Sequence, residues 1–239
     1  MTERDMLIQG AKQFGLSMQE RTAQQFETYA QLLVEWNQKI NLTAITEYQD
    51  IVTKHFLDSL ALAGCGLALE GANMIDVGTG AGFPGLALKL QFPTLRLTLL
   101  DSLAKRLHFL QTAVSEMGVD GVEFCHARAE DGGRDRALRE QFDIATARAV
   151  ARLSVLAEYC LPFIKVGGVL AALKGPMAQE ELEAAGHAIA VLGGRLREVR
   201  SVEIPFAALS HKIVLIDKVH PTPKQYPRKA GTPAKSPLG

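Results

Sequence analysis

The first 70 residues alternate apolar and polar positions with the period of a helix. Between Ser17 and about Ile40 the apolar side chains recur every three or four residues, at Phe26, Ala30, Leu33, Trp36 and Ile40. This spacing predicts one long amphipathic helix, and Ser17 with Glu20 matches a capping box at its start. A shorter helix is predicted near residues 3–14, and Asp50 is predicted to cap a third through IVTKHFLDSLALA. Residues 1–70 are therefore expected to form a helical cap.

After Gly71 the pattern changes to short apolar runs separated by helical stretches. The runs are NMIDVG, LRLTLLD, VEFCHA, FDIATAR, GGVLAALK, REVRSVEI and KIVLIDK. Helices are predicted after the first five, around residues 83–90, 103–118, 135–140, 151–162 and 177–192, which implies parallel strands with helices on both faces. The linker between the last two runs is too short for a parallel crossover, so they are expected to form an antiparallel hairpin. Residues 71–217 are thus predicted to form a doubly wound, seven-stranded α/β sheet, which resembles the Rossmann-like sheet of S-adenosylmethionine-dependent methyltransferases.

The last segment, residues 218–239, differs from both. It holds five prolines among 22 positions and is predicted to lack regular structure. The formal net charge of the chain is zero, but residues 1–70 carry nine acids and five bases, whereas residues 217–239 carry five bases and only Asp217. Charge blocks usually lie on solvated surfaces, yet a basic tail is also typical of a nucleic-acid-binding arm.

Composition excludes several classes of protein. No run of about 18 uncharged apolar residues predicts a membrane span, and the charged start MTERDMLIQG is unlike a signal peptide. A cytoplasmic protein is therefore expected. The cysteines, Cys65, Cys125 and Cys160, are odd in number and far apart, which favours buried thiols over disulfides. The histidines show no metal-ligand spacing, so no metal is expected.

The stretch MIDVGTGAGFPG, residues 74–85, is open to two interpretations. Gly80, Gly82 and Gly85 match a dinucleotide fingerprint, and Asp101 lies close to the usual distance of a ribose-binding acid. The same residues also read as Asp76-x-Gly78-x-Gly80-x-Gly82, the pattern of proteins that bind S-adenosylmethionine. Because Pro84 occupies the start of the helix that would face a pyrophosphate, the second interpretation is favoured.

The chemistry of the neighbouring residues suits a sulfonium cofactor. The carboxylate of Asp76 is expected to accept, directly or through water, from the methionine ammonium, and Asp101 to accept from both ribose hydroxyls. Glu130 and Ala129 follow the third strand, where this fold lines the adenine pocket, although a solvated loop acid is nearly as compatible with the sequence. Arg148 ends the fourth strand at the mouth of the site, where it would pair with a carboxylate or phosphate.

The methyl acceptor is indicated by what the chain lacks. Enzymes that methylate exocyclic amines usually carry an Asn/Asp-Pro-Pro-aromatic stretch after the fourth strand, where this chain reads Ala-Arg-Ala-Val, and no cysteine sits where pyrimidine-carbon methylation would need it. A purine ring nitrogen has an unprotonated lone pair, so its methylation requires neither that stretch nor a nucleophilic cysteine. No general base is therefore expected, and the reaction would depend on positioning, with Arg148 and Lys174 as candidates.

Over nearly its whole length the chain resembles the bacterial RsmG (GidB) family. The matching stretches are WNQKINLTAIT, KHFLDSLAL, DVGTGAGFPG, LLDSLAKRLHFL, RAED, ARAVARL, LKG and YPRKAGTPAKSPL. The resemblance implies methylation of N7 of a guanine, position 527, in the 530 loop of 16S ribosomal RNA. It also implies cofactor contacts at Gly78, Phe83, Ala129, Glu130 and Arg148. Relatives often have serine where this chain has Ala147, so this chain lacks a hydroxyl beside Arg148.

Several cations are candidates for RNA contact. The candidates are Lys105 and Arg106 after the second strand, Lys174 at the end of the fifth, and Tyr226, Arg228, Lys229 and Lys235 in the tail. Lysine and arginine bind phosphates and an aromatic ring stacks on an unpaired base, so RNA contact is favoured over the alternative of a frayed tail. Asn37, with Trp36, is expected either near the site or as a helix cap, and the roles of His55 and Asp58 stay open.

Three alternatives remain at this point. Zero net charge favours a small-molecule methyltransferase, and the glycine loop taken alone favours a dinucleotide-binding oxidoreductase. The third alternative is a non-catalytic RNA-binding or assembly protein that kept the fold. The expected partner is 16S ribosomal RNA, naked or within the small subunit, and the expected protein is a monomer without membrane contact.

Overall fold

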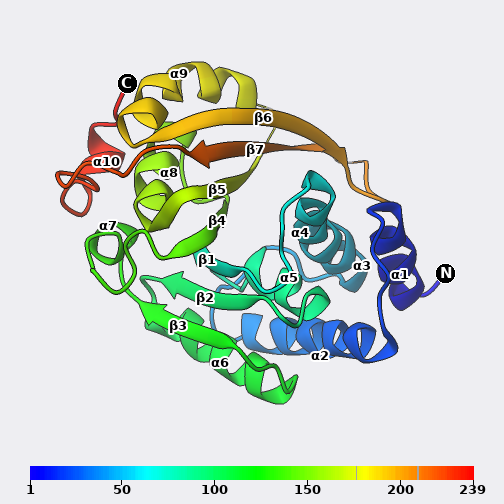
Figure 1. Ribbon diagram of the computed structural model, residues 1–239. Coiled ribbons are helices and arrows are strands. Elements are labelled where there is room, and N and C mark those ends of the chain that lie inside the picture. The colour runs from blue at the N-terminus through cyan, green and yellow to red at the C-terminus, as the bar shows by residue number, and fades with distance from the viewer. Residues whose placement is uncertain (176, 209) are drawn as a thin grey trace.

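The computed structural model describes residues 1–175, 177–208 and 210–239. Its centre is a seven-stranded sheet in the order β3-β2-β1-β4-β5-β7-β6 (Figure 1). The strands are β1 (Asn73–Val77), β2 (Arg96–Asp101), β3 (Val122–His126), β4 (Phe142–Arg148), β5 (Ile164–Lys174), β6 (Gly194–Glu203) and β7 (Ser210–Lys218). The predicted doubly wound α/β fold is confirmed.

Strand direction changes only at the end of the sheet. Strands β1 to β5 pair in parallel, while β7 is antiparallel to both β5 and β6, which confirms the predicted hairpin. The chain runs outward from β1 in both directions, through β2 on one side and β4 on the other. Ligands of doubly wound sheets bind at such a switch point, beyond the carboxyl ends of the strands.

Helices cover both faces of the sheet and complete two hydrophobic cores. One core joins the sheet to α5 (Gly85–Gln91), α6 (Ala104–Glu116) and the N-terminal helices, and the other joins it to α8 (Leu153–Cys160) and α9 (Ala178–Val191). Among the N-terminal helices, α2 (Glu20–Asn37) packs against both α5 and α6 (Figure 1). The predicted helical cap is thus part of the main core, because α2 presents a continuous apolar face to the sheet helices.

Two predicted helix starts are wrong. Helix α2 begins at Glu20 behind Gln19, whose side chain makes no capping bond, so Ser17 and Glu20 form no capping box. A capping box occurs instead at α1 (Glu3–Gln13), between Thr2 and Asp5. Asp50 lies inside α3 (Tyr48–Ile51) rather than before it, and it pairs with Lys54 one turn later at 2.8 Å. The S/T-x-x-E pattern is short enough to occur by chance.

The segment that follows α3 is helical but irregular. A π-helical turn, η1 (Val52–Leu57), leads into α4 (Asp58–Leu60) and a 3₁₀ turn, η2 (Ala61–Cys65). Single π turns within helices are frequent at functional sites, and this one carries His55. Among the described residues, no helix is both long and apolar enough to cross a bilayer.

The third crossover also differs from prediction. Residues 135–140 form turns, and the helix there is α7 (Ala129–Gly132), which begins directly after β3. The turns bring Arg139 to the tail, where its guanidinium donates to the carbonyl oxygens of Thr222 at 2.7 Å and Tyr226 at 2.8 Å. A short 3₁₀ turn, η3 (Leu161–Phe163), ends the next helix.

The tail is folded onto the sheet domain. Prolines prevent long regular elements, but a four-residue helix, α10 (Thr232–Lys235), forms beside α8 (Figure 1), so the prediction of no regular structure is wrong there. Arg228 pairs at 2.7 Å with Glu158, whose side chain is fully buried in α8. Buried ion pairs of this kind hold irregular segments in place, which a composition argument does not detect.

Candidate functional site

A cavity of about 560 Å³ opens beyond the carboxyl ends of β1, β2 and β4. Seven of the expected cofactor residues line it, namely Gly78, Gly80, Phe83, Asp101, Ala129, Glu130 and Arg148. These residues come from four segments that extend over 70 positions, from Gly78 to Arg148, and the sheet topology brings their strand ends together. Asp76 and Gly82, which were also expected at the cofactor, are not on the cavity wall.

The glycine loop needs its glycines for two different reasons. Gly78 and Gly80 have φ angles of 71° and 59°, in the left-handed region that favours glycine, and both border the cavity. Gly82 instead lies against protein: a Cβ there would overlap the hydroxyl of Tyr29 and approach Leu110 to 2.7 Å. The first two glycines therefore let main chain form the cavity wall, and the third permits close packing.

Asp76 holds the loop in place from behind. Its side chain is fully buried, and its Oδ2 accepts hydrogen bonds from Thr79 Oγ1 at 2.8 Å and from the Gly85 amide at 2.9 Å. Burial raises its pKa to about 6, and its Oδ1 has no partner among the described residues. The role that the structure shows for Asp76 is to join the loop to the start of α5, and its contact with an ammonium group stays a prediction.

Asp101 faces the cavity from the end of β2. Its Oδ2 accepts from the Gly80 amide at 2.9 Å and its Oδ1 from the Leu103 amide at 2.9 Å. Arg106, expected to contact RNA, lies here instead, with Nη1 3.4 Å from Asp101. Oδ1 can accept a second hydrogen bond, whereas the second partner of Oδ2 is the long 3.4 Å contact with Arg106, so a bound diol would compete with Arg106 there.

The far end of the cavity is closed by the tail. Glu130 Oε1 accepts a hydrogen bond of 2.7 Å from the amide of Gly231, and Gly231 and Ala234 line the cavity together with Tyr159. The tail therefore contributes wall to the same cavity as the strand ends.

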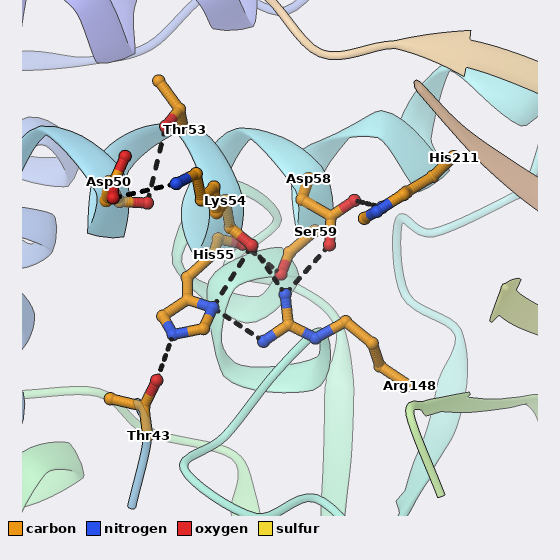
Figure 2. A network of polar contacts seen from close by, with 9 residues as sticks. All are labelled: Thr43, Asp50, Thr53, Lys54, His55, Asp58, Ser59, Arg148 and His211. Carbon is orange, nitrogen blue, oxygen red and sulfur yellow. Dashed lines mark hydrogen bonds and ion pairs between the residues drawn. The ribbon is translucent and has the colours of Figure 1, made fainter. Parts of the chain in front are cut away.

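The opposite end is built around Arg148 (Figure 2). Its Nη1 donates to Asp58 Oδ2 at 2.9 Å and to the Lys54 carbonyl at 3.0 Å, and its Nη2 lies 3.0 Å from His55 Nδ1. The other Asp58 oxygen is bonded to His211 Nδ1. This network, made by Asp58, His55, Arg148 and His211, joins the π-helical turn and α4 to the end of β4 and the start of β7.

The ring of Phe83 packs against this network. His55 stacks on its ring with centroids 4.5 Å apart, and the guanidinium carbon of Arg148 lies 5.0 Å from the ring centroid. Tyr29 stacks nearby at 5.2 Å. The aromatic face favours the cation of Arg148 and fixes the plane of the imidazole.

The two histidines of the network have opposite electrostatic environments. Burial, with the charge of Arg148 as a second cause, lowers the pKa of His55 to about 4. The hydrogen bond to Asp58 raises the pKa of His211 above its ordinary value. At neutral pH the charge of Arg148 is therefore balanced by Asp58, while His55 is neutral.

A sequence model of the family described as rRNA small subunit methyltransferase G matches residues 22–210. The chain belongs to this family. A relative of that name from Alkaliphilus metalliredigens (strain QYMF) is 49% identical over 238 residues, covering 100% of both chains. Another, from Exiguobacterium sibiricum, is 51% identical over 225 residues, covering 94% of each. The protein is therefore a methyltransferase of the S-adenosylmethionine-dependent class.

Solved structures support the fold. TrmN from Thermus thermophilus aligns with a TM-score of 0.53 at 20% identity, covering 70% of this chain and 53% of that one. TYW2 from M. jannaschii, in complex with AdoMet, aligns at 0.51 and 16% identity, covering 64% and 72%. At these identities the likeness shows the sheet architecture alone.

The remaining expected residues of this family member lie elsewhere. Lys105, Lys229 and Lys235 are exposed. Lys174 borders a second cavity of about 410 Å³, which shares His55 and Arg148 with the first, and its Nζ is 2.7 Å from Glu181. Tyr226 is partly buried, and Arg228 is paired with Glu158. Among the described residues, no group of three or more potential metal ligands occurs.

Sequence reasoning missed part of the wall. The missed residues include Leu42, Thr43, Ser102, Val150, Tyr159, Gly231 and Ala234. For Leu42 and Thr43 the sequence did offer a signal, the capping residue Asn37. Its Oδ1 accepts from the amides of Leu42 at 2.8 Å and Thr43 at 3.0 Å, and its Nδ2 donates to the Thr43 carbonyl at 2.9 Å. Asn37 thereby presents this loop to the cavity.

Proposed function

We propose that the protein transfers a methyl group from S-adenosylmethionine to N7 of a guanine, position 527, in the 530 loop of 16S ribosomal RNA. We also propose that the enzyme is cytoplasmic and monomeric. Its support is the full-length similarity to relatives named ribosomal RNA small subunit methyltransferase G, together with the chemistry of the acceptor end of the cavity.

The choice of a ring nitrogen as methyl acceptor rests on one observation: the polar side chains at the acceptor end of the cavity are already hydrogen-bonded to one another. Both oxygens of Asp58 are engaged, by Arg148 and by His211. His55 is bonded at Nδ1 to Arg148 and at Nε2 to Thr43. No described side chain at this wall is thus free to act as a general base, whereas N7 of guanine needs none, since its lone pair is already unprotonated.

The cavity fits the proposed donor. The main chain at Gly78 and Gly80 leaves room where a side chain would intrude, the Asp101 carboxylate would accept from the two ribose hydroxyls, and Ala129, Glu130 and the tail would enclose the base. Bound in this way, S-adenosylmethionine supplies an electrophilic methyl group. The residues of the chain then have to orient donor and acceptor in line and exclude water, with Arg148 held rigid between the two cavities.

RNA would be held by the exposed cations. Lys105, Lys229 and Lys235 are unpaired in the described structure and would contact phosphates, and Lys174 borders the second cavity. The acceptor base would lie beside His55, which lines both cavities. Tyr226 retains an exposed part for stacking. Arg228 is paired with Glu158 and Arg106 with Asp101. Arg228 would therefore mainly hold the tail in place, and Arg106 would mainly contribute to the cofactor cavity.

Nucleoside mass spectrometry tests the proposal. Undermethylated small-subunit RNA, as naked RNA and as assembled particles, is incubated with protein and S-adenosylmethionine, and 7-methylguanosine is expected at one position in the 530 loop. A matched reaction with the Asp101→Ala variant should show strong loss. Methylation of an exocyclic amine or a ribose, or incorporation into small molecules only, would contradict the proposal.

A further inference from the structure

Thr43 lies in the loop between α2 and α3, outside the strand ends that form most of the cavity. Its main chain is fixed by two hydrogen bonds to Asn37, with a third at the neighbouring Leu42 amide, and the residue lines the cavity beside His55. Figure 2 shows it at the end of the chain of contacts that runs from Asp58 through Arg148 and His55.

The proton positions along this chain follow from the contacts. A guanidinium can only donate, so the His55 Nδ1 that lies 3.0 Å from Arg148 Nη2 must be unprotonated. Without a proton, Nδ1 cannot donate to the Lys54 carbonyl 3.2 Å away, and that carbonyl accepts instead from Arg148 Nη1 at 3.0 Å. Because the imidazole is neutral, with a pKa of about 4 through burial and Arg148, its single proton is on Nε2. That N–H donates to Thr43 Oγ1 at 2.8 Å.

The Thr43 hydroxyl is thereby forced to donate. Its oxygen accepts a second hydrogen bond, of 3.0 Å, from the Ile45 amide, which occupies both lone pairs. The hydroxyl proton has no acceptor among the residues that the structure describes. A buried network with fixed polarity thus ends in one donor at the wall of the cavity, and that donor cannot reverse its role.

From this polarity, and resting on the function proposed above, we infer that the Thr43 hydroxyl donates to O6 of the target guanine and selects guanine over adenine. Guanine presents O6 and N7 side by side as acceptors, whereas adenine has an amino donor in place of O6. N7 must keep its lone pair for the methyl group, so O6 is the acceptor left for a protein donor. An adenine would place two donors against each other, an arrangement that sites built on hydrogen bonds reject strongly.

The test removes either partner of this hydrogen bond. Small-subunit RNA is assembled by ligation with guanine, inosine or 2-aminopurine at the target position; inosine keeps O6, and 2-aminopurine lacks it but keeps N7. For the wild type, kcat/KM is expected to be roughly 10- to 100-fold lower with 2-aminopurine than with guanine, and inosine should resemble guanine. Thr43→Val should abolish this discrimination, and Thr43→Ser, which keeps the hydroxyl, should restore it.

Other results would overturn the inference. If wild type methylates the 2-aminopurine RNA as well as the guanine RNA, O6 is not read, a result that requires no variant to fold. If Thr43→Val discriminates as strongly as wild type, another group reads O6. If Thr43→Val discriminates like wild type but binds S-adenosylmethionine more weakly in calorimetry, the hydroxyl serves the donor instead. Absence of 7-methylguanosine in the guanine RNA with wild type would refute the proposed function itself, separately from the role of Thr43.

Discussion

Arg148 and Asp58 form an ion pair, 2.9 Å from Nη1 to Oδ2, that joins the end of β4 to the N-terminal helical segment across 90 residues of sequence. The Asp58 side chain is 1% exposed and that of Arg148 17%. The pair therefore does more than link two elements. It neutralises the cation at the wall shared by the two cavities and holds it against the ring of Phe83.

Breaking this pair should destabilise the fold. Asp58→Asn keeps the shape but leaves Arg148 and His211 without their carboxylate, and removing one partner of a buried pair costs about 3–5 kcal/mol. The free energy of unfolding in urea measures the loss. The matched control is Glu35→Gln, which breaks an exposed pair with Lys39 and should cost about 0–1 kcal/mol. Equal costs for the two variants would contradict the role given to Asp58.

Asp101 should determine cofactor affinity. Asp101→Ala removes the acceptor for the ribose hydroxyls and also releases the amides of Gly80 and Leu103. A lost acceptor of this kind costs roughly 1–3 kcal/mol, so calorimetry with S-adenosylmethionine should show about 10- to 100-fold weaker binding. Glu116→Ala, an exposed acid at the end of α6, serves as the control and should bind as wild type does. Unchanged affinity of Asp101→Ala would show that the ribose lies elsewhere.

The stability of the protein should fall in acid because of His55. Its pKa is lowered from 6.5 to about 4 in the folded chain, so between these values the unfolded state binds a proton that the folded state does not. Stability is therefore lost as pH falls from about 7 to 4, by on the order of 3 kcal/mol at most. The difference in unfolding free energy between wild type and His55→Gln measures this, and a difference that is constant with pH would contradict the shift.

His211 provides a control of opposite sign. Its pKa is raised by the hydrogen bond to Asp58, so its favourable contribution is fully present below about pH 6.5 and is lost as pH rises through the folded value. His211→Gln should therefore cost more stability at pH 6 than at pH 9. His187→Gln, at an exposed position on α9, should show neither trend.

The sheet could be predicted from sequence because its signals are local. Each strand is a short apolar run, and the glycine loop and Asp101 follow two of these runs directly, so parallel topology was enough to bring them together. The helix at residues 135–140 was mispredicted because its turns are set by contacts of Arg139 with the distant tail. No local pattern carries such information.

Residues from outside the sheet were harder to place. Thr43 reaches the cavity because Asn37 fixes its loop, and Asp76, although part of the glycine pattern, is not on the cavity wall and holds the loop through Thr79 and Gly85. Arg106 and Arg228 both pair with carboxylates within the fold, which their charge alone could not indicate, and contact of these two residues with RNA stays a prediction. Pairing in three dimensions decides which cations remain available.

The tail should have two separable roles. Deletion of residues 229–239 keeps the Arg228–Glu158 pair but removes Gly231 and Ala234 from the cavity wall and the hydrogen bond of Gly231 to Glu130. Loss of that bond and of the wall should weaken S-adenosylmethionine binding by roughly 10-fold, as measured by calorimetry without RNA. Unchanged cofactor affinity would show that the tail does not contribute to the cofactor cavity.

The paired variant Lys229→Ala, Lys235→Ala separates the second role. Both side chains are exposed, so cofactor affinity should stay at the wild-type value, whereas RNA affinity should become less sensitive to salt. Each phosphate contact with single-stranded RNA contributes about 0.7 to the slope of log K against log salt concentration, and losing two should reduce that slope by about 1.4. If the slope is unchanged while the deletion weakens cofactor binding, the tail acts as a wall of the cavity and not as an RNA arm.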